Sequence, residues 1–317
     1  MRKLLALLFF TLSASAQTIS LHGWADAYRA WNSDNPHPAL NFFSGVGTTA
    51  HRANQLALNV AAIDIAKEPK PFGFHVTLVG GDSADVVHAG EPHRGAIRNL
   101  YQASMSYNAG KLGLEAGIYP SHIGFETFFS KDNWNYTRGW LAELSPYYES
   151  GIKASYAIND RWSAQLHGLN GWQNATAHAR KAIGTQLAFS GARLSASFNT
   201  YADSRRKFGD LVATWKTTDA LTLGGSLDHG HDPGAQWMGA AAFARYALND
   251  RHAFAVRAER FRDPQGSISG TPQRLREGTL TYEIRQTRHV LLKLEARRDH
   301  YLSTTQTLAI ASAVVMD

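Results

Sequence analysis

Charged side chains recur at every second position along several stretches of the sequence. Arg257 and Glu259 alternate with apolar or small residues, and Lys293, Glu295 and Arg297 do the same later in the chain. Successive side chains of an extended strand point to opposite faces, so such charges share one face. A mixed-charge face opposite an apolar face could line a water-filled passage. The ionisable residues in this phase are Asp26, Glu115, Glu149, Lys153, Arg193, Arg245, Arg257, Glu259, Lys293, Glu295 and Arg297.

A second concentration of polar groups lies in the long irregular segment 119–146. Its compact charged and hydrogen-bonding residues are suited to sorting hydrated solutes by size and charge, as the linings of selective pores do. These candidate constriction residues are Lys131, Asp132, Asn133, Asn135 and Arg138. The alternatives are an external cap, or an aromatic knot of Trp134 and Tyr136 that packs the segment against a wall. The sequence leaves these open.

Evidence for an enzyme or a cofactor is poor. The run Asp228-His229-Gly230-His231-Asp232 is a weak metal candidate, because two imidazoles and two carboxylates lie close in sequence. A solvated strand end is the commoner explanation of such a run. No nucleophile elbow, phosphate loop, dinucleotide fingerprint or haem attachment sequence is present. We therefore expect no catalytic residues, no cofactor and no resident metal.

The elements that would position these residues are β-strands. Segments such as 112–118, 152–158, 254–259 and 290–296 alternate apolar with polar or small residues at period two, which is the pattern of a half-buried strand. No stretch of comparable length has an apolar stripe at helical spacing. The chain after the leader is therefore predicted to be all-β, with an irregularity near Ala61-Ala62 that suggests a β-bulge.

Two kinds of connection alternate between the strands. Short turns are expected at 68–72, 108–111, 158–161, 190–192, 217–220, 248–251 and 286–289. Longer connections are expected at 32–52, 86–96, 119–146, 172–179, 203–207, 230–236, 262–273 and 302–305. Seven turns and eight loops join about sixteen strands, with 12–18 possible. An even strand number with short periplasmic turns is typical of an antiparallel up-and-down barrel in the bacterial outer membrane.

The N-terminus predicts export. Arg2 and Lys3 precede an apolar run from Leu4 to Leu12, and small residues at Ala14 and Ala16 favour cleavage before Gln17. Residues 1–16 are therefore expected to be a signal peptide, and 17–317 a single barrel domain. The apolar run is shorter than the roughly 20 residues of a membrane-spanning helix.

Composition favours a membrane barrel over a soluble β-protein. Charged residues make up only 18% of the chain, no long apolar run follows the leader, and aromatic residues are frequent. Aromatics near strand ends would suit the two membrane interfaces. They are Tyr107, Tyr156, Trp162, Trp215, Trp237 and Tyr246. The net charge of +6 comes from scattered basic residues, so no nucleic-acid partner is expected.

Several motifs resemble those of the putative beta-barrel porin-2 (OmpL-like) family. The most specific is the run from Ser130 to Arg138 after Tyr119-Pro120, and further similarity lies at 23–28, 84–88, 170–172 and 244–248. The resemblance implies an outer-membrane porin-like barrel, in which the loop after the fifth strand folds inward. Trimers are common for this architecture, so a homotrimer is expected by analogy.

The C-terminus departs from the usual pattern of these barrels. Outer-membrane barrels commonly end on an aromatic residue, whereas this chain ends Val-Val-Met-Asp. Within the last strand, Leu308, Ile310 and Val314 alternate in a phase that we expect to face outward, toward lipid.

These observations favour an outer-membrane porin that lets small hydrophilic solutes or ions diffuse passively, with membrane lipid around it. A closed structural or adhesive barrel is the alternative, in which the inward charges form an ion-pair lattice that fills the lumen. A barrel that hydrolyses lipid is a third hypothesis. Channel conductance would separate the first two, and lipid turnover would test the third.

Overall fold

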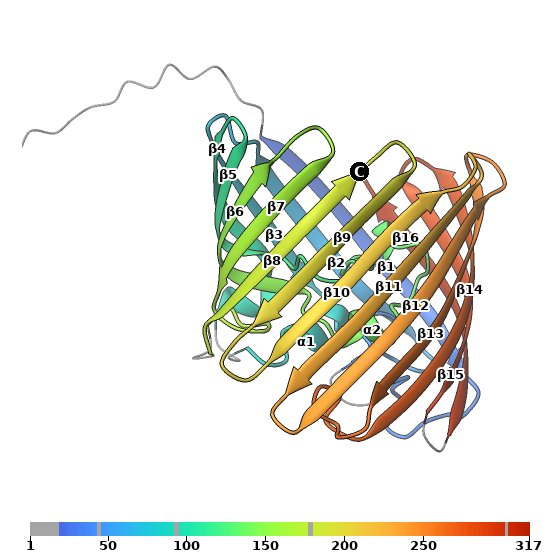
Figure 1. The fold of residues 1–317 in the computed structure, drawn as a ribbon. Helices are drawn as coiled ribbons and strands as arrows, with labels where there is room; N and C mark the ends of the chain where they lie inside the picture. Colours follow the sequence, from blue (N-terminus) through green and yellow to red (C-terminus); the bar gives the residue numbers. More distant parts are fainter. Residues whose placement is uncertain (1–18, 43–45, 92–94, 177–179, 302–303) are drawn as a thin grey trace, which may run out of the picture.

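Sixteen strands close into one antiparallel barrel in the computed structural model, which describes residues 19–42, 46–91, 95–176, 180–301 and 304–317 (Figure 1). Each strand pairs with its neighbours in sequence, and β1 pairs with β16. The predicted signal peptide, 1–16, lies outside the described residues. The strands are β1 (Ser20–Asn32), β2 (Leu56–Lys67), β3 (Phe72–Gly80), β4 (Leu100–Ala109), β5 (Leu112–Pro120), β6 (Tyr148–Ala157), β7 (Trp162–Leu169), β8 (Ala182–Ser190), β9 (Leu194–Ala202), β10 (Lys207–Lys216), β11 (Leu221–Asp232), β12 (Ala235–Ala247), β13 (His252–Asp263), β14 (Gln273–Thr287), β15 (Val290–His300) and β16 (Thr305–Met316).

The alternation of burial along the strands separates an outer face from an inner face. In β13 every second residue from Ala253 to Asp263 is buried. The residues between them, from Phe254 to Arg262, are exposed. Ile152 and Leu294 are exposed on the outer face, whereas Lys153 and Lys293 face inward, as the sequence pattern predicts. An apolar outer face and a polar inner face are what a strand needs between lipid and water.

The connections fall into two groups, as expected. All seven predicted short turns join the strands, from the turn after β2 to the turn after β14, and they lie at the same end as both termini of the barrel. The predicted connection 230–236 is much shorter, because β11 continues to Asp232 and β12 begins at Ala235. None of the described helices has the length and apolar character that would let it cross a membrane.

The helical segments are short and belong to the loops. They are α1 (Asp82–Val87), η1 (Ala96–Asn99), η2 (Ser130–Asp132) and α2 (Trp140–Glu143). The main apolar cluster lies inside the barrel, where Phe42, Tyr136 and Trp140 from two loops meet Tyr28 and Phe261 of the wall. The loops therefore supply about a third of the buried residues of this internal core.

This internal core explains two errors of the sequence analysis. Leu308, Ile310 and Val314 were expected to face lipid but are buried on the inner face, and Leu308 and Ile310 belong to the apolar cluster. Trp237 was assigned to an interface girdle but is also buried in this cluster. Apolar residues on these strands pack against the inserted loops, so apolar character alone gave the wrong phase.

The predicted bulge in β2 lies two residues earlier than expected. Asp26 of β1 pairs with Val60 and the next residue, Ala27, pairs with Leu58, so Asn59 is the extra residue. The Asn59 side chain is buried and donates a hydrogen bond to Asp26, 2.8 Å from Nδ2 to Oδ2. A bulge can redirect one side chain in this way.

Candidate functional site

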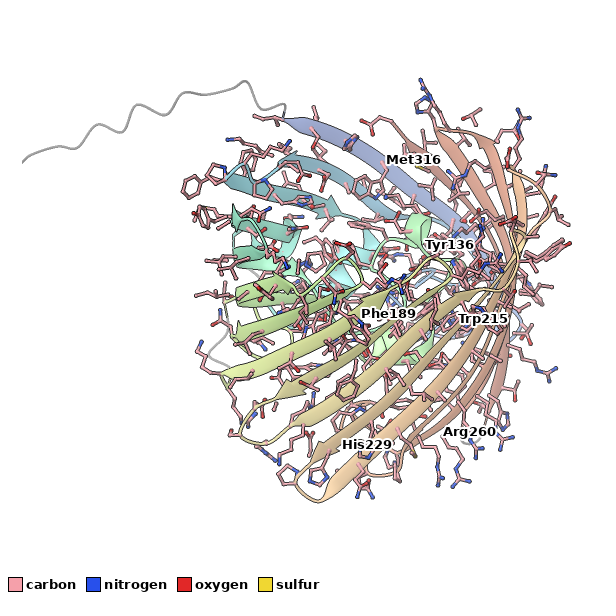
Figure 2. The ribbon with its side chains drawn as sticks, turned by 45° about the horizontal axis from the view of Figure 1, so that its top comes forward. Tyr136, Phe189, Trp215, His229, Arg260 and Met316 are labelled. Atoms are coloured by element: carbon pink, nitrogen blue, oxygen red, sulfur yellow. The ribbon has the colours of Figure 1, made fainter. Side chains whose placement is uncertain are left out.

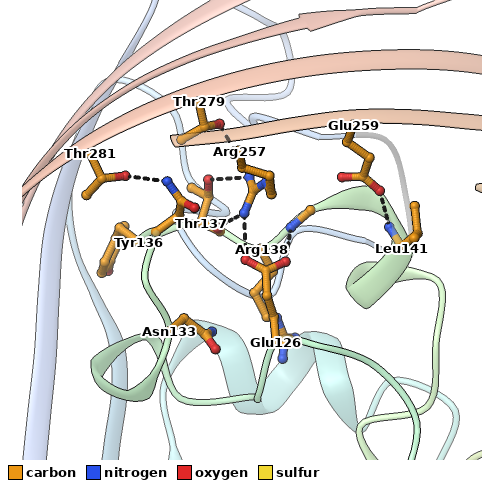
Figure 3. A network of polar contacts seen from close by, with 12 residues as sticks. Glu126, Asn133, Tyr136, Thr137, Arg138, Leu141, Arg257, Glu259, Thr279 and Thr281 are labelled. Carbon is orange, nitrogen blue, oxygen red and sulfur yellow. Dashed lines mark hydrogen bonds and ion pairs between the residues drawn. The ribbon is translucent and has the colours of Figure 1, made fainter. Parts of the chain in front are cut away.

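The loop between β5 and β6, residues 121–147, folds into the barrel and is attached to the wall on several sides. Figure 3 shows its segment from Glu126 to Leu141 beside the inner faces of β13 and β14. The predicted inward loop therefore exists, and its backbone polar groups use charged wall residues as partners.

The first attachment is to β13. Arg257 forms an ion pair with Glu126 of the loop, 2.7 Å from Nη1 to Oε1, and donates to the Thr137 carbonyl at 2.6 Å. Its Nε also contacts Glu277 of β14 at 2.9 Å. Two residues further along β13, Glu259 accepts hydrogen bonds from the backbone at the start of α2. The two wall charges therefore fix this part of the loop.

The second attachment is to β15. Glu295 accepts hydrogen bonds from the backbone of Tyr136 and Thr137, at 2.6 and 3.1 Å. Lys293 donates to the carbonyls of Ser130 and Asn133. Alternation along β15 presents both charges to the same segment of the loop.

The third attachment is to β1. Asp26 accepts from Ser130 Oγ at 2.5 Å and from the Tyr136 hydroxyl at 3.0 Å. Burial, together with the nearby Asp26 carboxylate, raises the pKa of Tyr136 well above its ordinary value. The phenol therefore stays protonated and remains a donor.

The fourth attachment lies on β6, β7 and β9. His122 Nδ1 is 2.8 Å from Glu149, its Nε2 is 3.0 Å from the Thr200 carbonyl, and its ring stacks on His167 at 4.2 Å. Burial alone would lower the pKa of His122, but the hydrogen bond and charge of Glu149 outweigh it and raise the pKa. In the described part of the chain, His122, Glu149 and His167 are the one group with a metal-compatible arrangement.

A second loop, which follows β1, packs on the first. Glu143 of α2 accepts hydrogen bonds from the backbone of Gly47 and Thr48, at 2.9 and 3.1 Å. Arg138 lies 3.7 Å from Glu143 and stacks 3.8 Å above the Tyr147 ring. The two loops thus form one packed body inside the lumen.

The candidate constriction residues divide into two groups. Asp132 is exposed and Lys131 is partly exposed, and the two side chains contact each other at 2.9 Å. Asn133, Asn135 and Arg138 are buried, the last two completely. The buried three hold the loop together, so Lys131 and Asp132 carry the polar surface of this segment.

The candidate pore-lining residues face inward with one exception. Arg193 lies in the exposed turn between β8 and β9 and donates to the Thr217 carbonyl. Two inward ion pairs keep partial exposure, Lys153–Glu115 at 2.5 Å and Arg245–Glu283 at 2.8 Å. The residues buried beneath the loop are Asp26, Glu149, Arg257, Glu259, Lys293, Glu295 and Arg297.

One cavity remains inside the barrel, and another lies at its end with the longer loops. A cavity of about 430 Å³ toward the short turns is lined by Asp64, His75, Lys131 and Asp132 among others. A second cavity of about 550 Å³ lies among the longer loops and carries the basic residues Arg180, Arg205 and Arg206 with acidic Asp203 and Asp232. Each cavity is lined by charges of both signs.

The weak metal candidate of β11 does not form a site. Asp228 is buried and Asp232 turns inward to Arg206, whereas His229 and His231 are exposed on the outer face. The strand alternation that sequence reasoning applied elsewhere thus separates the imidazoles from the carboxylates, and the four cannot surround one ion.

Comparison with known proteins identifies the family. The family model described as "Putative beta-barrel porin-2, OmpL-like" matches residues 18–314. The chain belongs to this family. It is therefore a porin-type barrel of the bacterial outer membrane. No curated protein matches the sequence.

Solved structures share the fold of this porin-2 family member at low sequence identity. An anion-selective porin from Comamonas acidovorans aligns with a TM-score of 0.66 at 12% identity, over 95% of this chain and 100% of that chain. A loop L8 deletion mutant of OmpT, an outer membrane protein of Vibrio cholerae, has a TM-score of 0.65 at 9% identity with the same coverage. A mutant of Rh. blastica porin has a TM-score of 0.61 at 12% identity, again covering 95% and 100%.

Sequence reasoning missed several residues that hold the loop of this porin-2 barrel. Glu126, His122 and Glu143 lie in loops, where no periodicity shows which way a side chain points. Glu277 and Asp299 lie in strands and share the inward phase, so extending the alternation along β14 and β15 would have found them.

Proposed function

We propose that this barrel lets small hydrophilic solutes or ions diffuse across the outer membrane, through lumen space beside the inserted loop. The observation that carries the proposal is the anchored loop between β5 and β6. It divides the lumen and presents Lys131 and Asp132 to the cavity on the side of the short turns. A rigid charged constriction between two wet vestibules is how a wide barrel selects by size and charge.

The main support for a rigid constriction is the number of wall strands that hold the loop. Charged residues of β1, β13 and β15 and His122 against β6 fix it on different sides. A loop held in this way keeps its charges at fixed positions relative to passing ions. Those ions would come within about 8 Å, the Debye length at physiological salt, where charges act with little screening.

Conductance in planar bilayers tests the proposal. The purified barrel should form open channels, and deleting 131–138 should raise the conductance by removing the constriction. The deletion should not prevent barrel assembly, because the loop adds no rung to the strand ladder. Lys131→Glu should shift selectivity toward cations, more strongly in dilute salt. Lys111→Glu, in the exposed turn between β4 and β5, is the matched control and should leave selectivity unchanged. Absence of conductance from the folded barrel would overturn the proposal.

A closed structural barrel is the second candidate, and one observation favours it. The lumen beside β13 to β15 holds fully buried charges, among them Arg257, Lys293 and Arg297, each paired under the loops. If the whole lumen were filled in this way, the loop deletion would open a channel that the intact protein lacks. The same bilayer experiment therefore distinguishes the two candidates.

We also propose a homotrimer. The support is analogy with a structural neighbour, in-vitro folded OmpT of Vibrio cholerae in its trimer form, which aligns with a TM-score of 0.64 at 8% identity. Mass measurement of the protein in detergent tests it, and a monomer under conditions where the barrel stays folded would contradict it.

A further inference from the structure

Five arginines point away from the barrel on three neighbouring strands. They are Arg260 and Arg262 of β13, Arg274 and Arg276 of β14, and Arg298 of β15, and all are exposed. Figure 2 labels Arg260 on the outside of the wall, whereas Tyr136 lies within the barrel. These five residues are called the outer arginine patch below. A membrane barrel that exposes arginine toward lipid needs a reason, because such positions are unfavourable inside the apolar layer.

The strand register brings the arginines face to face. Arg262 pairs with Arg274, and Arg260 pairs with Arg276 on the same outer face. Residues directly opposite on neighbouring strands have Cβ atoms about 5 Å apart, and like charges in such pairs repel each other. Two stacked pairs therefore concentrate four positive charges on a small area.

Nothing in the described part of the chain neutralises this charge. No ion pair or side-chain hydrogen bond involves any of the five guanidinium groups among the described residues, and the acidic residues of the strands lie on the inner face. Among the described strands, the outer face therefore has no carboxylate to compensate the patch. An exposed positive cluster without internal partners is complementary to an external anion.

An apolar groove lies next to the patch. It has a volume of about 700 Å³ on the outer side of β9 to β13, and Phe198, Leu211, Leu227 and Met238 contribute exposed apolar side chains to it. Arg260 and Arg262 border the same groove. A ligand in this place would have an apolar part in the groove and an anionic part against the arginines.

The height of the patch on the barrel fits a lipid headgroup. Arg260 follows Val256 and Ala258 on the outer face of β13, toward the end with the longer loops. At the other end of the same strand, Phe254 stacks on Tyr282 with ring centroids 4.8 Å apart, as expected of an aromatic interface girdle. If the short turns are periplasmic, the arginines lie at the outer leaflet.

We propose that the outer arginine patch and its groove bind a lipid with phosphate groups on its headgroup, as the lipid A of the outer leaflet has. The arginines hold the phosphates by paired N–H to oxygen hydrogen bonds, for which the planar guanidinium is well shaped. An acyl chain fills the groove. This site is separate from the lumen and does not depend on the proposed function.

A second copy of this chain is a poorer partner for the patch. A trimer contact at this place would have to supply carboxylates from an outer wall, and the acidic residues of the strands face inward. Lipid phosphate supplies the missing negative charge directly. The observations therefore favour the lipid.

The test compares the binding of diphosphorylated lipid A with that of the same lipid after removal of its phosphates, in vesicles of zwitterionic phosphatidylcholine. The variant replaces Arg260, Arg262, Arg274 and Arg276 with Gln. Its matched control replaces four exposed arginines of the short turns, Arg161, Arg193, Arg251 and Arg288, with Gln, so that net charge changes equally. Folding of each barrel is checked by heat-modifiable gel migration.

The unaltered protein and the control should bind diphosphorylated lipid A at least about tenfold more tightly than the patch variant, since charge-assisted hydrogen bonds to phosphate are lost. Removal of the phosphates should abolish the difference. Equal binding by the patch variant would overturn the proposal. So would inorganic phosphate binding as tightly as the lipid, because the groove would then contribute nothing.

Two further measurements separate the remaining outcomes. Ala240→Trp should fill the groove and weaken lipid A binding while leaving the arginines in place. If the patch variant instead loses its oligomeric state in phosphate-free lipid, with lipid A binding unchanged, the patch is a contact between copies and the proposal is wrong. Should four substitutions prevent folding, the double variant Arg260→Gln with Arg276→Gln decides the same question.

Discussion

The two faces of β13 and β15 use the same residue type in opposite ways. On the inner face, Arg257 and Arg297 are almost completely buried and each contacts carboxylates of the wall or loop. On the outer face, Arg260 and Arg298 are exposed and have no ion-pair partner among the described residues. The inner arginines complete a structure within the barrel, whereas the outer ones offer a surface to something beyond it.

The difference shows that burial and pairing, and not residue type, decide what an arginine contributes. A buried charge that loses its partner is costly, because the remaining charge stays without water or counter-charge. An exposed arginine near the membrane interface contributes little to folding and is free to bind a ligand. The two faces can therefore be separated by matched substitutions a few residues apart.

The largest expected effect is on the inner face of β13. Arg257→Met should destabilise the barrel by about 3–5 kcal/mol, because it leaves Glu126 and Glu277 buried without their partner. Arg260→Met, three residues away, should change stability by no more than about 1 kcal/mol in phosphatidylcholine. Urea unfolding followed by tryptophan fluorescence measures both. Equal effects would mean that the two faces do not differ.

The same comparison of an inner and an outer arginine can be made on β15, which shows whether the difference is specific to β13. Arg297→Met removes the partner of Asp299, whereas Arg298→Met acts on the next residue, on the opposite face. The first should again be the more destabilising by about 3 kcal/mol, on the same physical argument. If Arg298→Met destabilised the barrel more than Arg297→Met, the effect on β13 would be due to local packing and not to the face of the wall.

A smaller effect should appear when lipid and salt are varied. Lipid A should raise the unfolding midpoint of the unaltered barrel by about 1–2 °C, the shift that corresponds to about 1 kcal/mol for a chain of roughly 300 residues, because the entropy of unfolding is about 2.1 cal/mol/K per residue. High salt should reduce this increase, because contacts between exposed charges are screened. The inner pairs are buried, so in phosphatidylcholine alone the midpoint should hardly respond to salt. Insensitivity to salt with lipid A present would place the lipid elsewhere.

The sequence was sufficient for the barrel because period-two alternation is repeated in most strands. The same rule correctly assigned Arg257, Glu259, Lys293 and Glu295 to the inner face. The same alternation assigns Arg260, one residue after Glu259, to the outer face. The outer arginine patch was therefore readable from the sequence.

Other features could not be read from the sequence, because they depend on contacts between distant segments. Arg138 looked like a pore charge, yet its burial arises from Tyr147 and from the loop after β1. Leu308 looked lipid-facing because nothing in its strand reveals an apolar loop inside the barrel. Periodicity gives the alternation of faces, but the contents of the lumen decide which face is apolar.

The smallest expected effect concerns an ion pair of the inner face that titrates, unlike the arginines. His122 joins the inserted loop to Glu149, and the raised pKa of His122 means that the folded protein holds this proton more tightly than the unfolded chain. Its contribution to stability is complete below the ordinary histidine pKa of about 6.5 and is lost as the pH rises through the raised value. The unfolding midpoint should therefore fall slightly as the pH rises above about 6.5. His122→Asn should remove this slope, whereas His300→Asn, on the exposed outer face, should leave it unchanged. If His122→Asn keeps the full slope, the proton belongs to another group, and the loop is held by the inner carboxylates and arginines without help from the imidazole.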